Sequence, residues 1–499
     1  MQPMFALAAH LQSERNINIL VFCPEKNEAF CTSLGLEFVS IWPQVDMLTN
    51  DDMRKAAASG DAGGLFDAIA KLRVLGIPTG VRAVIKAMRS FCPDLILTGP
   101  LDNNLADAVS VALRVPVVVG FLQLNALSSQ ITSFLGERRF HYLSWLAVFL
   151  IINKTVDAVE GPLLRAAFGD ELPADRLLLA DCSYARCLHE WNHPISPVLV
   201  SASAHVSPKP TDLCPAYDSR LVLTGAWVVE QDRQIAISTI SAEPASEAPF
   251  GGAGTLDALT AFLAAGPKPV YVGWGSMLAG TPERMAQLAV RALKQAEQRG
   301  VLGGGAARLS VDMLAGAGDA AAELVAYARA HVLFVHSAPH EWLFPQCTVV
   351  VHHGGAGTTA AAMRSGTPAV VTPMLVDQFE NAARTARAKA GVAMPQFTKV
   401  TPAALASALR TCLQPEMQAA AAALGTTLRA EDGLGAASER LELFYKEEVC
   451  TGVYAAAFDA RVAARAHFRK RRLLRGGLLG ALHSAAVVFK LLVGLAKAP

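Results

Sequence analysis

Residues 349–359 read VVVHHGGAGTT, and this stretch decides the fold. The β-branched run predicts a buried strand, the glycines predict a tight turn, and the residues from Thr358 onward predict a helix. The first backbone N–H groups of such a helix lack partners within it and bind anions. Because glycine has no Cβ, Gly354, Gly355 and Gly357 would let a phosphate group approach the backbone closely.

Two side chains of this turn would add to the anion site. Thr358 carries a hydroxyl donor, and His352 would sit against a phosphate oxygen, either protonated or donating from one ring nitrogen. Dinucleotide and flavin sites use similar physics. The order H-H-G-G-A-G lacks the G-x-G-x-x-G spacing, and no acidic residue follows at a strand end about twenty residues later. These departures argue against a dehydrogenase.

Strand and helix patterns alternate on both sides of the turn. In the C-terminal half, strands are predicted at 269–273, 332–335, 348–351 and 369–373, and helices at 282–299, 358–365 and 380–390. In the N-terminal half, strands are predicted at 17–23, 94–99 and 115–120. Such alternation is typical of parallel α/β sheets, and 499 residues suit two domains of this kind.

Shifts in composition mark the domain boundaries. Residues 237–254 turn to Ser, Ala, Glu, Pro and Gly, which predicts a linker between a domain at 1–236 and a domain at 255–445. Residues 446–499 are a basic extension, and positions 453–499 hold nine Lys and Arg residues against one acid. A basic amphipathic tail can lie on an anionic membrane surface, so peripheral membrane contact is one hypothesis. A solvated or domain-packed helix is the other.

Composition excludes several classes of function. A net charge of +1 provides no overall field to recruit nucleic acid. Nine cysteines without a C-x-x-C pair predict no disulfide framework and no metal site, and reduced thiols in a cytoplasmic protein are the expectation. The segment 4–11 lacks a basic flank and a cleavage site, so it predicts a packed helix rather than a signal peptide. The apolar run 143–152 is too short to span a membrane and predicts a core helix.

Further motifs surround the turn in a fixed order. Residues 273–277 read GWGSM, residues 337–345 read SAPHEWLFP, Gly366-Thr367-Pro368 follows the helix, and Asp377-Gln378 comes after Pro373. Together with the turn they closely resemble the donor signature of UDP-dependent glycosyltransferases of the GT-B fold, glycosyltransferase family 1. The likeness is greatest to sterol 3-β-glucosyltransferases and to macrolide and glycopeptide glycosyltransferases. The resemblance implies two Rossmann-like domains with parallel sheets that face a cleft.

The resemblance also implies a role for each motif in binding a UDP-sugar, without a metal or other cofactor. Gly275 and Ser276 would border the nucleotide. The uracil would meet backbone groups of Ser337, Pro339 and His340. The diphosphate would be held by His352, Gly354, Gly355, Ala356, Gly357 and Thr358. The sugar hydroxyls would be read by Asp377 and Gln378, as acceptor and donor.

Other side chains near these motifs have simpler interpretations. For Trp274 and Trp342 we expect core packing rather than stacking on the base, and for His353 we expect a space-filling role behind the turn. In a glycosyl transfer, negative charge grows on the departing diphosphate, and positioned donors lower that barrier. One such donor is worth roughly 3–4 kcal/mol, against about 1 for a helix dipole. We therefore expect His352 to outweigh the dipole.

The start of the chain departs from the family pattern. Family members begin with a strand and a G-S-x-G-D-V-Q-P loop whose Asp is the candidate general base, whereas this sequence opens on Met1-Gln2-Pro3. Catalysis by an inverting transferase needs a base within hydrogen-bond reach of the acceptor oxygen. Asp102, in a loop after the strand near Gly99, is a weak candidate, and His10 a weaker one. Either the coding sequence begins further upstream, or catalysis is weak or lost.

Three functions follow from the sequence. The first is inverting transfer of a hexose, with glucose expected, from a UDP-sugar to a lipophilic hydroxyl such as that of a sterol. The second is a catalytically silent UDP-sugar-binding protein. The third is transfer to a soluble natural product, as in the macrolide relatives. The acceptor itself is not readable, because variable loops build the acceptor pockets of this fold.

Overall fold

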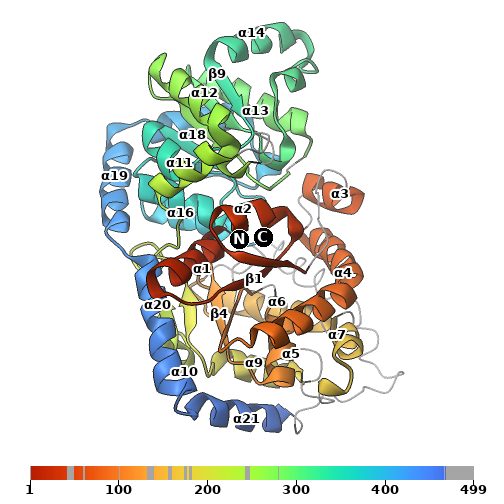
Figure 1. The fold of residues 1–499 in the computed structure, drawn as a ribbon. Coiled ribbons are helices and arrows are strands. Elements are labelled where there is room, and N and C mark those ends of the chain that lie inside the picture. The colour runs from red at the N-terminus through yellow and green to blue at the C-terminus, as the bar shows by residue number, and fades with distance from the viewer. Residues whose placement is uncertain are drawn as a thin grey trace.

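Figure 1 shows two α/β domains stacked one above the other, each built on a parallel sheet. The computed structural model describes residues 2–41, 50–59, 62–100, 102–131, 140–155, 160–172, 177–178, 182–241, 248–278, 280–465 and 467. The α/β fold predicted from the alternating pattern is confirmed.

The C-terminal domain contains six parallel strands in the order β12-β11-β10-β7-β8-β9. Their bounds are β7 (Val270–Gly273), β8 (Gly300–Gly303), β9 (Val332–Val335), β10 (Val349–His352), β11 (Ala369–Val371) and β12 (Gly391–Ala393). The helices that cover the two faces are α12 (Gly252–Ala264), α13 (Pro282–Gln295), α14 (Ala321–His331), α15 (His340–Leu343), α16 (Ala356–Ser365), α17 (Gln378–Arg387) and α18 (Pro402–Cys412). Every residue of β10 is buried, as a strand covered on both faces requires.

The N-terminal domain contains a two-stranded and a four-stranded parallel sheet, the latter in the order β3-β4-β5-β6. The strands are β1 (Leu20–Cys23), β2 (Glu37–Ser40), β3 (Ile96–Thr98), β4 (Val117–Phe121), β5 (Val198–Val200) and β6 (Leu221–Leu223). The main helices are α1 (Gln2–Arg15), α2 (Glu28–Ser33), α3 (Asp51–Ser59), α4 (Ala62–Phe91), α5 (Asn103–Leu113), α6 (His141–Thr155), α7 (Gly161–Phe168), α9 (Tyr184–Asn192) and α10 (Pro215–Asp218).

Several local predictions differ from the structure. The helix predicted at 282–299 ends at Gln295, and Gly300–Gly303 forms the buried strand β8. Because glycine is not hydrophobic, the two glycines of this strand hid it from the sequence pattern. A Cβ on Gly300 would clash with the Leu293 side chain, and a Cβ on Gly303 would clash with the Tyr271 side chain. Helix α6 confirms the core helix at Trp145, which is 2% exposed, but its first turn exposes Tyr142 and Leu143.

The segment 237–254, predicted as a linker, is helical at both ends. Helix α11 (Gln231–Ile240) enters it, and α12 begins at Gly252, after the short 3-10 turn Pro249–Gly251. Residues 242–247 lie outside the described residues. Helix α11 packs on α12 and α15, so it belongs to the C-terminal domain although it starts before the predicted boundary.

The chain returns to the N-terminal domain at its C-terminal end. Figure 1 shows the blue helices α19 (Pro415–Arg429), α20 (Gly433–Phe444) and α21 (Val453–Arg465) descending from the upper domain along the lower one. Helix α20 packs on α1, and Phe444, Tyr454 and Phe458 join the core of the N-terminal domain. These three helices tie the two domains together.

The basic extension differs from its prediction at two arginines. Arg465 is 3% exposed and pairs with Asp107 and Glu190, with nitrogen–oxygen distances of 2.8 and 2.9 Å. Arg461 donates to the carbonyl of His193 and lies near Glu190. In the predicted tail, 453–465 is therefore a domain-packed helix, because the buried carboxylate of Glu190 and the partly buried carboxylate of Asp107 attract its cations. The residues after 467 lie outside the described part of the chain.

Within the described residues, no helix is long and apolar enough to cross a membrane. The same residues contain no group of three or more His, Cys, Asp or Glu side chains placed to hold a metal ion.

Candidate functional site

The strand–turn–helix predicted from residues 349–359 is present. Strand β10 ends at His352, Gly354 turns the chain with φ +92°, and α16 begins at Ala356. The residue before the helix, Gly355, offers no side-chain cap, so the first-turn N–H groups are left for a ligand or water. The positive φ favours glycine at position 354, where a Cβ would lie 2.9 Å from the Gln378 carbonyl oxygen.

His352 is fully buried, and its geometry defines its tautomer. The backbone N–H of Gly354 donates to Nδ1 at 3.0 Å, so Nδ1 is an acceptor and the ring proton sits on Nε2. Nε2 is buried and has no hydrogen-bond partner among the described residues. Burial, followed by the neighbouring His353 and His340, lowers the pKa of His352 to about 3. Of the two forms foreseen from sequence, the neutral donor is the one present.

Two further histidines lie close to His352 and are also neutral. His353 lies between two glycines of the site: a Cβ on Gly355 would be 2.4 Å from its Nε2, and one on Gly275 would be 3.4 Å from its Cε1. Burial lowers the pKa of His353 to about 4. His340 stacks on Phe344, its Nε2 lies 3.3 Å from the Tyr271 hydroxyl, and burial lowers its pKa to about 4. The site therefore has no imidazolium charge.

The loop before α17 is braced from inside. The side-chain Oε1 of Gln378 accepts the N–H groups of Met374 and Leu375, at 2.8 and 3.1 Å. Between them and Gln378 lies Val376, a β-branched residue with φ +54°. Such residues rarely adopt this conformation, and they do so mainly at functional sites where the surroundings impose it. The bracing leaves the side-chain nitrogen of Gln378 as its donor for a ligand.

Asp377 directly precedes α17 and does not cap it with its side chain. The carboxyl is half-buried, and burial raises its pKa to about 6, opposed by a backbone hydrogen bond and by Arg384. Above that pH the carboxylate is a strong acceptor that a sugar hydroxyl would satisfy. The alternative role for the Asp377 side chain, capping of the helix that follows it, is not seen in the structure.

The nucleotide-facing residues predicted from sequence occupy the carboxyl ends of the same sheet. Gly275 and Ser276 follow β7 and are exposed, and the Gly275 carbonyl accepts the Ala306 N–H at 2.9 Å. Ser337 and Pro339 follow β9, and the Ser337 hydroxyl is buried without a hydrogen-bond partner in the described structure. Ligands of open α/β sheets bind at this edge. Unmatched polar atoms of Ser337, His352 and His353 point to a ligand there.

Both tryptophans near the site are packed rather than open to a base. Trp274 is 1% exposed, its ring meets Phe397 edge-on, and its N–H donates to the Thr372 hydroxyl at 3.0 Å. Trp342 packs against the cluster around Tyr271. The core-packing interpretation is confirmed for both.

The N-terminal domain meets this site at the carboxyl ends of its own strands. Leu122 after β4, Ser201 after β5 and Ala226 after β6 line an interdomain cavity together with α16. Asp102 follows β3, the next parallel strand, so it lies at the same edge of the sheet. His10 lies on α1 with its Nε2 buried and unpartnered within the described residues. A Cβ on Gly357 would lie 3.7 Å from the Pro3 side chain, which places the start of α1 beside the turn.

Sequence reasoning missed several residues that hold or border the site. The side-chain amide of Asn381 donates to the Gly354 carbonyl at 2.8 Å and fixes the turn. Arg384, one turn further along α17, lines the interdomain cavity together with Ser203 and Glu431. Asn381 could have been found from sequence, because residues three positions apart lie on the same face of a helix and Gln378 was already a predicted site residue. Nothing local in the sequence connects Ser203 and Glu431.

Comparison with known proteins agrees with this geometry. Residues 301–432 match the model of the erythromycin biosynthesis protein CIII-like C-terminal domain. A sterol 3-β-glucosyltransferase of Arabidopsis thaliana is 37% identical over 172 residues, 34% of this chain and 26% of that protein. The vancomycin aglycone glucosyltransferase of Amycolatopsis orientalis is 32% identical over 254 residues, 50% of this chain and 51% of that protein. The matched segments therefore span between a quarter and about half of these relatives.

Solved structures extend the likeness to the whole fold. The glycosyltransferase of kitacinnamycin aligns with a TM-score of 0.57 and 19% identity, covering 88% of this chain and 95% of that chain. The calicheamicin glycosyltransferase CalG4 aligns with a TM-score of 0.56 and 15% identity, covering 89% and 95%. Residues 301–432 thus match the erythromycin biosynthesis protein CIII-like C-terminal domain, within a chain that has the GT-B fold and is similar in sequence to sterol 3-β-glucosyltransferases and a glycopeptide glucosyltransferase.

Proposed function

We propose that this protein is an inverting UDP-glycosyltransferase that moves a hexose, with glucose expected, to a hydroxyl of a lipophilic acceptor such as a sterol. The observation that carries the proposal is the buried Nε2–H of His352, which lacks an acceptor in the described structure and lies beside the first turn of α16. A diphosphate would accept hydrogen bonds from this Nε2–H and from the first-turn N–H groups of α16. The matches to sterol glucosyltransferases support glucose and a sterol.

In the proposed reaction the acceptor oxygen attacks C1 of the hexose, and the bond from C1 to the diphosphate oxygen breaks. The electron pair leaves with UDP, whose growing charge meets the His352 Nε2–H and the α16 N-terminus. Asp377 and the Gln378 amide hold the sugar hydroxyls. The acceptor proton passes to a base at the N-terminal domain edge, for which Asp102 is the candidate. No metal takes part in this scheme.

The test is transfer from radiolabelled UDP-glucose to a panel of sterols by the full-length chain, with the glycolipid identified by mass spectrometry. Replacement of His352 by Ala should abolish most of the product. Replacement of His331 by Ala is the matched control, because that histidine is exposed on α14 in the same domain. Absence of product with every hexose donor and lipid would contradict the proposal.

Calorimetry separates the competing functions. UDP binding without transfer would identify a silent binding protein, and no UDP binding would reject both functions. Because the solved structure of the glycosyltransferase VinC contains dTDP, titration with dTDP as well as UDP decides the nucleotide. Transfer to a macrolide or glycopeptide aglycone, rather than to sterols, would favour the natural-product function, which the vancomycin aglycone glucosyltransferase match supports.

Membrane contact is a separate part of the proposal. Because Arg461 and Arg465 are engaged with the N-terminal domain, we propose that membrane contact uses the basic residues of the extension after residue 467. Deletion of residues 468–499 should therefore abolish sedimentation with phosphatidylserine vesicles while the folded domains remain. Equal sedimentation of the full-length and shortened chains would remove the membrane from the proposal.

A further inference from the structure

The cavity between the two domains has largely apolar walls, but a few polar side chains that the proposed reaction does not use also line it. It has a volume of about 50 Å³, and from the N-terminal domain it is lined mainly by residues 201–207. From the C-terminal domain it is lined along one face of α16, from Ala356 to Met363, and by Asn381 and Arg384 of α17. A cavity of this volume holds roughly four water molecules, enough for a small ion but not for a sugar nucleotide.

Arg384 is the unusual member of this lining. Its side chain is 7% exposed, and its Nε donates to Glu380 at 2.9 Å. The four remaining N–H groups of the guanidinium make no hydrogen bond to any described residue, although they lie in a largely buried position. Because Arg384 lines the cavity, an acceptor inside the cavity could bind these N–H groups.

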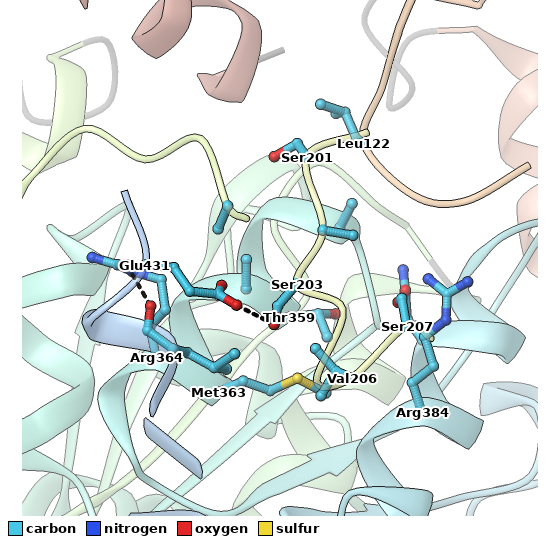
Figure 2. A pocket seen from close by; sticks show the side chains of 16 residues that line it. Leu122, Ser201, Ser203, Val206, Ser207, Thr359, Met363, Arg364, Arg384 and Glu431 are labelled. Atoms are coloured by element: carbon cyan, nitrogen blue, oxygen red, sulfur yellow. Dashed lines mark hydrogen bonds between the residues drawn. The ribbon is translucent and has the colours of Figure 1, made fainter. Parts of the chain in front are cut away.

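The carboxylates around Arg384 do not accept hydrogen bonds from its remaining N–H groups. Glu380 is shared with Arg387, whose guanidinium donates to the same oxygen at 2.6 Å. Asp377 acts on Arg384 only through its longer-range charge. Glu431 also lines the cavity, but it accepts from the Ser203 hydroxyl at 2.6 Å. Figure 2 shows Glu431 and Arg364 at one end of the pocket and Arg384 with Ser207 at the other.

Ser207 supplies a donor from the opposite domain. It is 4% exposed, and it lines the cavity. We propose that the cavity binds a small tetrahedral oxyanion of the phosphate or sulfate class, held by the guanidinium fork of Arg384 and the Ser207 hydroxyl. Planar guanidinium groups bind such anions through paired N–H groups. Because these two residues belong to different domains, the anion stabilises their closed arrangement.

The experiment is thermal unfolding with inorganic phosphate titrated at constant ionic strength against chloride. Saturating UDP is present throughout, so that the diphosphate site is already filled. Phosphate should raise the Tm of the wild-type protein, and Arg384→Gln and Ser207→Ala should weaken the apparent phosphate affinity at least tenfold. Arg387→Gln is the matched control: it removes an arginine from the same carboxylate, but this one is 59% exposed and does not line the cavity.

Three outcomes would overturn the inference. Equal effects of chloride and phosphate would show charge screening alone. Equal phosphate responses in the wild type, Arg384→Gln and Ser207→Ala would place binding elsewhere. Loss of the response in the presence of UDP, with a response in its absence, would make the cavity part of the diphosphate site. If Arg384→Gln fails to fold, Ser207→Ala still decides, because removing one hydroxyl leaves the buried ion pair intact.

Discussion

The candidate donor site contains histidines that burial keeps neutral. A positive imidazolium would have been the obvious partner for a diphosphate, yet the bond from the Gly354 N–H to Nδ1 of His352 fixes the neutral Nε2–H form. A neutral donor with its orientation set before the ligand arrives needs no reorganisation as charge develops. Asn381 holds the same turn from the other side through the Gly354 carbonyl.

Replacement of His352 by Ala should weaken UDP binding about 10- to 100-fold, because a hydrogen bond to a charged group is worth roughly 1.5–3 kcal/mol. His352→Gln should recover part of the affinity, since its amide nitrogen can reach the place of Nε2. Titration calorimetry measures both. An affinity unchanged in His352→Ala would show that the helix N-terminus alone binds the diphosphate.

Acid should destabilise the protein through its buried histidines. For His340 the folded pKa is about 4, below the unfolded value near 6.5, so the unfolded chain binds the proton first as pH falls. Stability is therefore lost progressively from about pH 6.5 down to about pH 4. At pH 5 the loss due to His340 is about 2 kcal/mol. Buried carboxyls with raised pKa values, such as Glu341, act in the opposite direction, so a variant is needed to isolate the histidine.

That variant is His340→Phe, which keeps a ring against Phe344. Urea unfolding at pH 7.5 and pH 5.0 should show a smaller loss of stability for His340→Phe than for the wild type, by about 2 kcal/mol. The same loss in both proteins would mean that His340 is not neutral in the folded state.

At the scale of elements, the turn between β10 and α16 works because its backbone has no room for side chains. Gly354→Ala would put a methyl group 2.9 Å from both the Gln378 carbonyl and Val371, at a φ of +92°. We expect a loss of about 1–3 kcal/mol in stability together with weaker UDP binding. Gly254→Ala, with open space around its Cβ in α12, should leave UDP binding unchanged and cost no stability, because alanine is favoured over glycine in a helix by up to about 1 kcal/mol. Thermal unfolding measures the stability of the two variants, and calorimetry measures their UDP affinity. The same result for both variants would contradict the prediction.

At the scale of the whole molecule, α21 is tied to the N-terminal domain by the ion pairs of the buried Arg465 with Asp107 and Glu190, by a longer contact of Arg461 with Glu190, and by one exposed ion pair. Arg465→Ala removes the buried partner of Asp107 and one of the partners of Glu190, and it should cost about 3–5 kcal/mol. Asp459→Ala breaks the exposed pair with Arg114 and should cost at most about 1 kcal/mol. Urea unfolding compares the two directly, and similar costs would show that the buried pair does not hold the helix.

Much of the fold around the candidate site was predictable from sequence, for a physical reason. A strand, a glycine turn and a helix start are encoded by neighbouring residues, so residues 349–359 predicted β10, the turn and α16. The Asp377-Gln378 pair follows β11 at the same sheet edge. Strand β8 escaped because its glycines carry no hydrophobic signal, although they lie against Tyr271 and Leu293.

Other features were decided only by tertiary structure, because they join residues that are distant in sequence. Arg465 reaches Asp107 across 358 positions, which turned a supposed surface cation into a buried one. Glu431 meets Ser203 across 228 positions, and Ser207 and Arg384 line one cavity from different domains. The tautomer of His352 likewise follows from the fold of the turn. Local sequence determined the strand, the glycine turn and the helix start of the candidate diphosphate site, because neighbouring residues encode them; tertiary packing determined the charges and donors around that site.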